Sequence, residues 1–72
     1  MQNASEIRER LAEADPNFRR LLRKHQDYEK RLQDLQSRKF LTEDEKIEEV
    51  EIKKHKLALK DQMEEMVRRA SH

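Results

Sequence analysis

The stretch Ser37–Glu45 lies between two long helical patterns, and it constrains the fold more than any other part of the chain. Thr42 is a favourable N-cap, and Glu45 stands three residues later, so the pair predicts a capping box. The acidic residues that follow Thr42 suit the positive end of a helix. These signals predict a turn over residues 38–42, and the alternative is one unbroken helix through residue 40.

A heptad pattern precedes this turn. Apolar and aromatic residues recur there at alternating spacings of three and four, which is typical of a coiled-coil seam. Pro16 suits the first position of a helix that Asp15 caps, so a helix is predicted over residues 16–37. A short helical segment over residues 4–14 precedes it, and the chain either breaks or kinks between the two. The predicted seam of the longer helix is Phe18, Leu21, His25, Tyr28, Leu32 and Leu35.

The last predicted helix, residues 43–69, has apolar residues on two nearly opposite faces at 100° per residue. A reversal near residues 40–41 makes the two long helices antiparallel and places Leu32 opposite Val50. The group predicted to complete the hairpin seam is Ile47, Val50 and Leu57. The group predicted to need another partner is Ile52, Leu59, Met63 and Met66.

Two partners are available for that second group. The N-terminal segment can fold back onto it through Ile7 and Leu11, or a second copy of the chain can dock there. A lone hairpin of this size buries little apolar surface. The free energy gained by that burial only marginally offsets the conformational entropy lost on folding. We therefore predict a homodimer with a four-helix arrangement.

The overall composition limits the class of protein. Charged residues make up 46% of the chain and glycine is absent, which with helical periodicity is typical of coiled coils and not of disordered chains. The net charge of +1 gives no global basic excess for nucleic acid or an anionic membrane. There is no cysteine, no apolar run approaching the ~20 residues of a membrane span, and no signal-peptide pattern at the N-terminus. A cytoplasmic protein is expected.

Charges are segregated along the predicted hairpin. Two basic runs without acids, residues 16–25 and 53–60, are expected to meet at its open end, and acidic residues gather at the turn. Three interpretations stay open: solvated helix faces, antiparallel docking of two hairpins, or docking of the basic end on nucleic acid or an acidic protein. No aromatic residue is interleaved with these cations to stack on bases. The predicted basic end is Arg19, Arg20, Arg23, Lys24, Lys53, Lys56 and Lys60.

No residue set has the spacing of a catalytic or metal site. His25 lies on the seam and is interpreted as a packing residue, because no second histidine or carboxylate cluster stands at ligand spacing. A glycine-rich phosphate loop is impossible in a chain without glycine. The sequence therefore predicts no enzyme, no metal, no cofactor and no small-molecule ligand.

Several short motifs in both long helices resemble those of a known family. They are Pro16-x-Phe18, Lys24-His25 and Leu35 in the first helix, and Ile52-Lys53-Lys54 and Lys56-Leu57-x-Leu59-Lys60-Asp61 with Met63 in the second. Over about residues 7–67 the chain resembles the YdcH-like family of small bacterial proteins of unknown function. The resemblance implies a helical hairpin from a bacterial cytoplasm, and it brings no catalytic residues. The chain departs from the family in having Tyr28-Glu29 where Leu-Asp is usual, and a turn without glycine.

The predicted molecule is one all-α domain over residues 1–72. It is an antiparallel, coiled-coil-like helical hairpin with a short N-terminal helical segment and a tail over residues 70–72, and it dimerises into a helical bundle. Its predicted function is non-enzymatic protein–protein interaction, by helix–helix contact and self-association, with a second copy or an unidentified protein as partner and no membrane. The alternative is a small nucleic-acid- or ribosome-associated factor that uses the basic open end.

Overall fold

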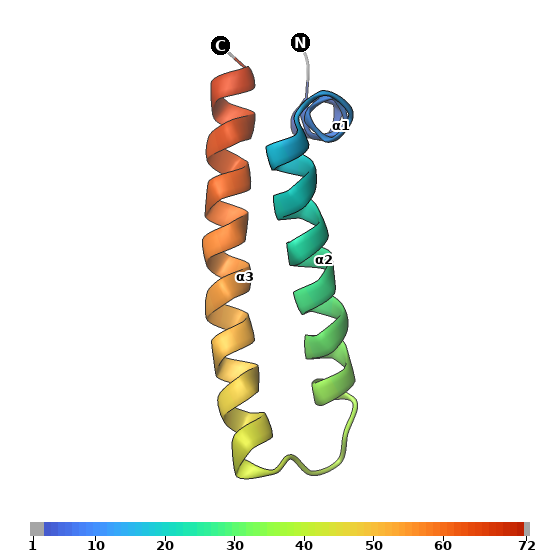
Figure 1. Cartoon of the computed structure of the whole chain (residues 1–72), viewed down its shortest axis with the longest axis vertical. Helices are drawn as coiled ribbons and strands as arrows, with labels where there is room; N and C mark the ends of the chain where they lie inside the picture. Colours follow the sequence, from blue (N-terminus) through green and yellow to red (C-terminus); the bar gives the residue numbers. More distant parts are fainter. Residues whose placement is uncertain (1–2, 72) are drawn as a thin grey trace.

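The computed structural model describes residues 3–71, which form three helices: α1 (Ala4–Ala14), α2 (Pro16–Gln36) and α3 (Glu43–Ala70). The predicted all-α class is confirmed, and residues 3–71 contain no strand. α2 and α3 run antiparallel and side by side, and α1 lies across their open end, where both termini also lie (Figure 1). The molecule is elongated, at 46 × 21 × 16 Å.

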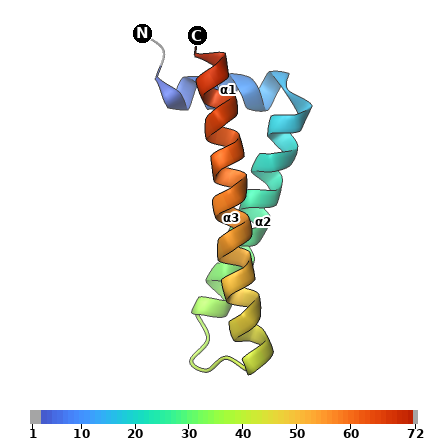
Figure 2. The same cartoon turned by 90° about the vertical axis from the view of Figure 1, so that its left-hand side faces the viewer.

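The chain breaks between α1 and α2. Asp15 is extended, with φ −113° and ψ 109°, which is the geometry expected before a proline. Its carboxylate accepts hydrogen bonds from the backbone N–H groups of Asn17, at 2.9 Å, and Phe18, at 3.4 Å, and so caps α2. Because this cap replaces helical geometry at Asp15, α1 turns away from the axis of α2 and lies across the hairpin (Figure 2).

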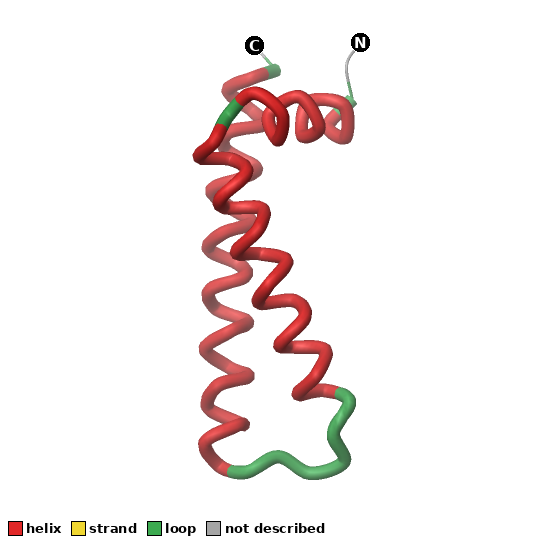
Figure 3. Tube along the Cα trace, turned by 45° about the vertical axis from the view of Figure 1, so that its right-hand side comes forward, coloured by secondary structure: helices red, strands yellow, loops and turns green. Residues whose placement is uncertain are grey.

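The capping box predicted at the start of α3 is confirmed. The Thr42 hydroxyl accepts from the Glu45 backbone N–H at 3.1 Å, and the Glu45 carboxylate accepts from the Thr42 backbone N–H at 3.0 Å. Ser37 closes α2 as its C-cap, so residues 37–42 form the loop and the alternative of an unbroken helix is wrong (Figure 3). The tail predicted over residues 70–72 begins one residue later than predicted, because α3 extends to Ala70. Residue 72 lies outside the described residues.

The core near the loop consists of Leu32 and Leu35 from α2 and Ile52 from α3, with Tyr28 and Leu41 packed against it. Leu35 has no exposed surface. Further along the hairpin, burial continues toward α1, and no polar or charged residue is buried among residues 3–71. The buried set is Ile7, Phe18, Leu32, Leu35, Ile52, Leu59 and Met63.

The face of α3 that packs on α2 is the one opposite to the predicted face. Ile47 and Leu57 are each 61% exposed and Val50 is 50% exposed, so their assignment to the hairpin seam is wrong, as is the pairing of Leu32 with Val50. Leu32 instead packs in one cluster with Ile52. The residues assigned to an outward partner face lie inward: Ile52, Leu59 and Met63 are buried and Met66 is half-buried.

The error lies in the rotation of α3 about its axis, since the predicted register is nearly correct. A register that places Leu32 opposite residue 50 places Tyr28 opposite residue 54, and Tyr28 stacks on His55 with ring centroids 5.5 Å apart. The observed rotation buries Ile52 and Leu59, which are seven residues apart and extend the seam along the helix. It also brings Glu48 of α3 to Arg31 of α2, as described below.

α1 covers the open end of the hairpin and contacts both long helices. Ile7 is buried, and it lines a shallow pocket with Ala4 and Val67 at the end of α3. Leu11 is half-buried. Of the two partners considered for the end of α3, the N-terminal segment of the same chain is therefore the one present in this structure.

Candidate interaction site

One side of the hairpin carries a groove of about 520 Å³ between α2 and α3. Its apolar lining includes the buried side chains of Phe18, Leu32 and Met63. Half-buried Leu22 and exposed Leu57 complete the apolar part. The groove is therefore a shallow apolar trough that two helices form together.

The polar lining of this groove is strongly cationic. Lys53, Lys56 and Lys60 come from α3, and Arg8 reaches the groove from α1. Among residues 3–71, Glu29 is the only carboxylate that lines it. The full set of charged or titratable residues in the lining is Arg8, His25, Glu29, Lys53, Lys56 and Lys60.

Glu29 is already engaged by its neighbours. Its carboxylate lies 3.7 Å from the Lys56 ammonium and 4.0 Å from Nδ1 of His25, whose side chain is 21% exposed. Lys53 lies 3.9 Å from the carboxylate of Glu49, one turn earlier on α3. Arg8 and Lys60 form no ion pair with any other residue between 3 and 71. The groove thus retains an excess of positive charge.

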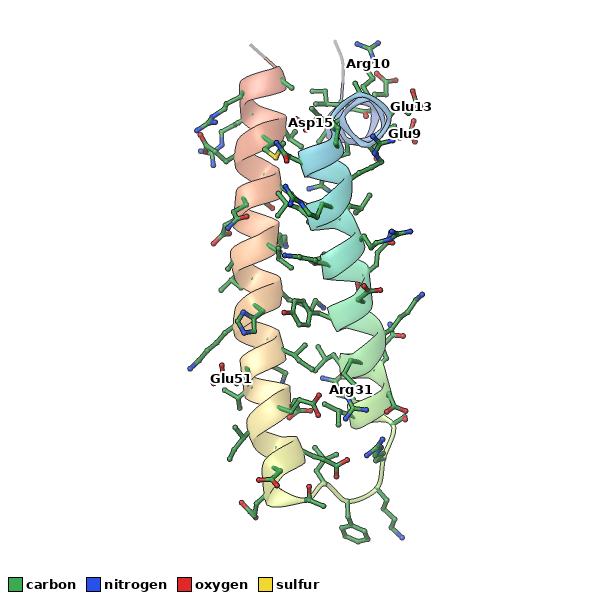
Figure 4. All side chains as sticks on the ribbon, in the orientation of Figure 1. Glu9, Arg10, Glu13, Asp15, Arg31 and Glu51 are labelled. Atoms are coloured by element: carbon green, nitrogen blue, oxygen red, sulfur yellow. The ribbon has the colours of Figure 1, made fainter. Side chains whose placement is uncertain are left out.

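Acidic residues gather at the loop end, and three of them are paired with arginines of the same chain. Arg31 donates two hydrogen bonds to Glu48 across the hairpin, at 3.0 and 2.8 Å, and a third to Asp34 at 3.1 Å. Arg38 pairs with Asp34 at 2.9 Å and with Glu45. Figure 4 shows Arg31 near the loop end of the hairpin. These three carboxylates are therefore held by two arginines of the same chain.

These contacts shift the pKa values of three groups. The hydrogen bond to Glu48 raises the pKa of Arg31, and the same bond lowers the pKa of Glu48. The backbone N–H of Thr42 lowers the pKa of Glu45, with a smaller contribution from the charge of Arg38. Each shift favours the ionised form that the folded hairpin uses.

The sign of these shifts predicts how stability depends on pH. A carboxylate whose folded pKa is lowered stabilises the fold above its unfolded pKa, and that stabilisation is lost as the pH falls through the folded value. The urea midpoint is therefore expected to fall as the pH drops below the ordinary carboxylate range of about 4. Glu48→Gln is expected to lower the midpoint at neutral pH and to reduce the acid-dependent fall.

Glu51→Gln is the matched control, because Glu51 forms no ion pair within residues 3–71. Figure 4 shows its side chain on α3. This variant should keep the midpoint and the acid dependence of the parent chain. An unchanged acid response in the Glu48→Gln variant would show that the Arg31–Glu48 contact is not a source of the pH dependence.

The outer face of α3 presents exposed apolar residues, here called the outer stripe: Ile47, Val50 and Leu57. They lie on the side of the helix away from the buried face, and Leu57, at the edge of the stripe, also lines the groove. Single exposed apolar residues are normal on protein surfaces, whereas several on one helix face indicate a contact surface. Phe40, in the loop, is 82% exposed and lies outside the stripe, with the Lys39 ammonium 5.8 Å from its ring centroid.

The structure divides the predicted basic end between two surfaces. Lys53, Lys56 and Lys60 line the groove. Arg19, Arg20 and Arg23 surround a separate shallow pocket on α2, and Lys24 is exposed. Leu22 lines both the groove and that pocket, so the two surfaces adjoin along α2.

Within residues 3–71 no group of three or more His, Cys, Asp or Glu side chains is arranged to hold a metal ion. None of the three described helices combines the length and the apolar character needed to cross a membrane.

These features define a small helical-hairpin protein whose exposed apolar surfaces are a helix face and an interhelical groove. A family model described as a protein of unknown function (DUF465) matches residues 18–67, and the chain therefore belongs to this family. The resemblance to the YdcH-like family is consistent with it. The match spans nearly all of α2 and α3 and leaves out α1. No curated protein and no solved structure was found to match the chain.

Proposed function

We propose that the protein is a non-enzymatic interaction module that acts through helix–helix contact, including self-association through the outer stripe. The exposure of Ile47, Val50 and Leu57, at 50–61%, carries this proposal. These three large apolar side chains lie on one helix, and half or more of each remains exposed. The setting proposed for the protein is a bacterial cytoplasm, which the family resemblance and the absence of cysteine support.

Self-association would cover surface that the fold leaves in water. A chain of 72 residues buries a smaller share of its surface than a larger domain does, so additional burial contributes more to its stability. A two-fold dimer brings the same patch of both subunits together, so the outer stripe of one copy would pack on that of the other. Each apolar side chain removed from water there contributes about 1.5–3 kcal/mol when fully buried.

Sedimentation analysis of an Ile47→Ser/Val50→Ser variant tests the proposal. At micromolar concentration the parent chain is expected to sediment with a mass near twice 8.8 kDa. Removing two apolar contacts per subunit is expected to weaken dimerisation by roughly tenfold or more. Both positions are exposed, so the variant should keep its helical circular dichroism.

The matched control is Phe40→Ser, which removes an exposed apolar side chain outside the stripe. It is expected to leave the dimer unchanged. A concentration-independent monomer mass for the parent chain would contradict self-association. Equal weakening by Phe40→Ser would contradict the outer stripe as its surface.

A second candidate function is binding of single-stranded RNA or DNA by the basic open end. The observation that favours it is the cluster of Arg19, Arg20 and Arg23 next to the cationic groove. Phe18 is only 1% exposed, so its ring is not available to stack on bases. Retention of RNA at low salt, lost in an R19Q/R20Q/R23Q variant and weakened steeply by added salt, would support this candidate.

A further inference from the structure

We propose that the groove between α2 and α3 is a docking site for an amphipathic helix of another protein that has an apolar face and acidic residues along one edge. This rests on the proposed role as an interaction module. The groove adjoins the outer stripe, because Leu57 belongs to both, but the rest of its lining lies outside the stripe. The shape of the groove, the placement of its charges and the state of its single carboxylate carry the proposal.

The dimensions of the groove suit a helix. On α2 the lining extends from Phe18 to Leu32, which corresponds to about 21 Å at 1.5 Å per residue, or roughly four helical turns. Two packed antiparallel helices leave a trough in which a third helix can place its apolar face. The apolar lining of Leu22, Leu57 and Met63 supplies the complementary surface for such a helix.

The charges of the groove specify which edge of the docked helix is acidic. Lys53, Lys56 and Lys60 follow one another on α3 at spacings of three and four, so one ammonium lies at each successive turn. The α2 wall contributes Leu22, His25 and Glu29 to the lining, and no lysine or arginine of α2 lines the groove. Glutamate or aspartate residues spaced three or four apart on one edge of the partner would therefore meet the lysine row of α3.

Glu29 argues against a continuous polyanion as the occupant. Its carboxylate lies in the groove and is held by Lys56 at 3.7 Å, so a phosphate backbone would pass close to a like charge. A small amphiphile is disfavoured for another reason, because ligand pockets usually enclose most of the ligand's surface and this groove is open along one side. A helix needs only one face covered, which is what the groove provides.

The test uses two synthetic helical peptides of about 18 residues, roughly five turns. Both carry the same leucine stripe, and one has glutamates along one edge where the other has lysines. The glutamate peptide is expected to bind and to shift the backbone amide signals of His25, Glu29 and Lys56 in NMR spectra. The lysine peptide is expected to bind at least tenfold more weakly, and added salt should weaken the glutamate peptide.

A lysine triple variant identifies the surface. Lys53→Gln/Lys56→Gln/Lys60→Gln is expected to weaken binding of the glutamate peptide by roughly tenfold, the effect of three charge pairs. The matched control, Lys24→Gln/Lys39→Gln/Lys54→Gln, makes the same change in net charge at exposed positions outside the groove lining and should bind as the parent does. Glu29→Gln is expected to tighten binding, because it removes the one carboxylate that the described part of the chain places in the groove.

The outcomes that would overturn the groove proposal are distinct from those that concern the outer stripe. Ile47→Ser/Val50→Ser should still bind the glutamate peptide even where it no longer dimerises. Equal affinity for both peptides, or the same weakening by both lysine triple variants, would overturn the proposal. Tighter binding of phosphatidylglycerol vesicles or single-stranded RNA than of the glutamate peptide, with shifts at the same groove amides, would also overturn it.

Discussion

Replacing Phe18 with alanine is expected to lower the free energy of unfolding by about 3–5 kcal/mol. Phe18 is 1% exposed, and it lies in the first turn of α2, just after the break from α1. Truncation would remove the apolar contacts of the ring and leave a cavity that the surrounding helices fill only in part. The measurement is urea unfolding followed by far-ultraviolet circular dichroism.

The chain contains its own control for this change, because its only other phenylalanine, Phe40, is 82% exposed. Phe40→Ala should change the free energy of unfolding by no more than about 0.5 kcal/mol. Phe18→Leu keeps an apolar side chain and should give an intermediate loss if the alanine variant does not fold. Equal effects of Phe18→Ala and Phe40→Ala would contradict the placement of Phe18 in the core.

The helix boundaries were predictable because local chemistry determines them. Thr42 and Glu45 satisfy each other's backbone N–H groups within four residues of chain, so the sequence alone contains both halves of the capping box. Asp15 and Pro16 likewise set the break before α2 through a cap and a fixed backbone angle. None of these contacts depends on how the helices later pack.

The rotation of α3 was not predictable from apolar spacing, because its apolar residues form two groups of similar size on opposite faces. What distinguishes the groups is non-local. With the observed face inward, Glu48 reaches Arg31 across the hairpin, and His55 stacks on Tyr28. One local signal did favour this face: Ile52, Leu59 and Met66 form a row of three at seven-residue spacing, whereas the other group has only the pair Val50 and Leu57 at that spacing.

The candidate groove was predictable only in part. The run of Lys53, Lys56 and Lys60 was recognisable as basic from the sequence, and its position on the predicted open half is as the structure has it. The contribution of Arg8 was missed, because it depends on α1 lying across the hairpin. The pairing of Glu48 with Arg31 was also missed, because it depends on the rotation of α3.

A pair of isoleucines tests that rotation directly. Ile52→Ala is expected to lower the free energy of unfolding by about 2–5 kcal/mol, because Ile52 is 4% exposed and packs with Leu32 and Leu35. Ile47→Ala makes the same chemical change five residues earlier in the same helix, where the side chain is 61% exposed. Its effect on the monomer should be no more than about 0.5 kcal/mol. Both variants have the same intrinsic helix propensity change, so the difference between them reports packing alone.

The concentration dependence of the two variants separates the fold from self-association. The loss in Ile52→Ala should be the same at low and high protein concentration, because Ile52 packs within one chain. Any loss of unfolding free energy in Ile47→Ala should grow with protein concentration. It would come from a weakened dimer, and dimerisation stabilises the folded chain more at higher concentration. A large, concentration-independent loss in Ile47→Ala with little effect of Ile52→Ala would mean that α3 packs on its other face. In that case the groove and the outer stripe would both have to be reassigned, because the rotation of α3 defines them.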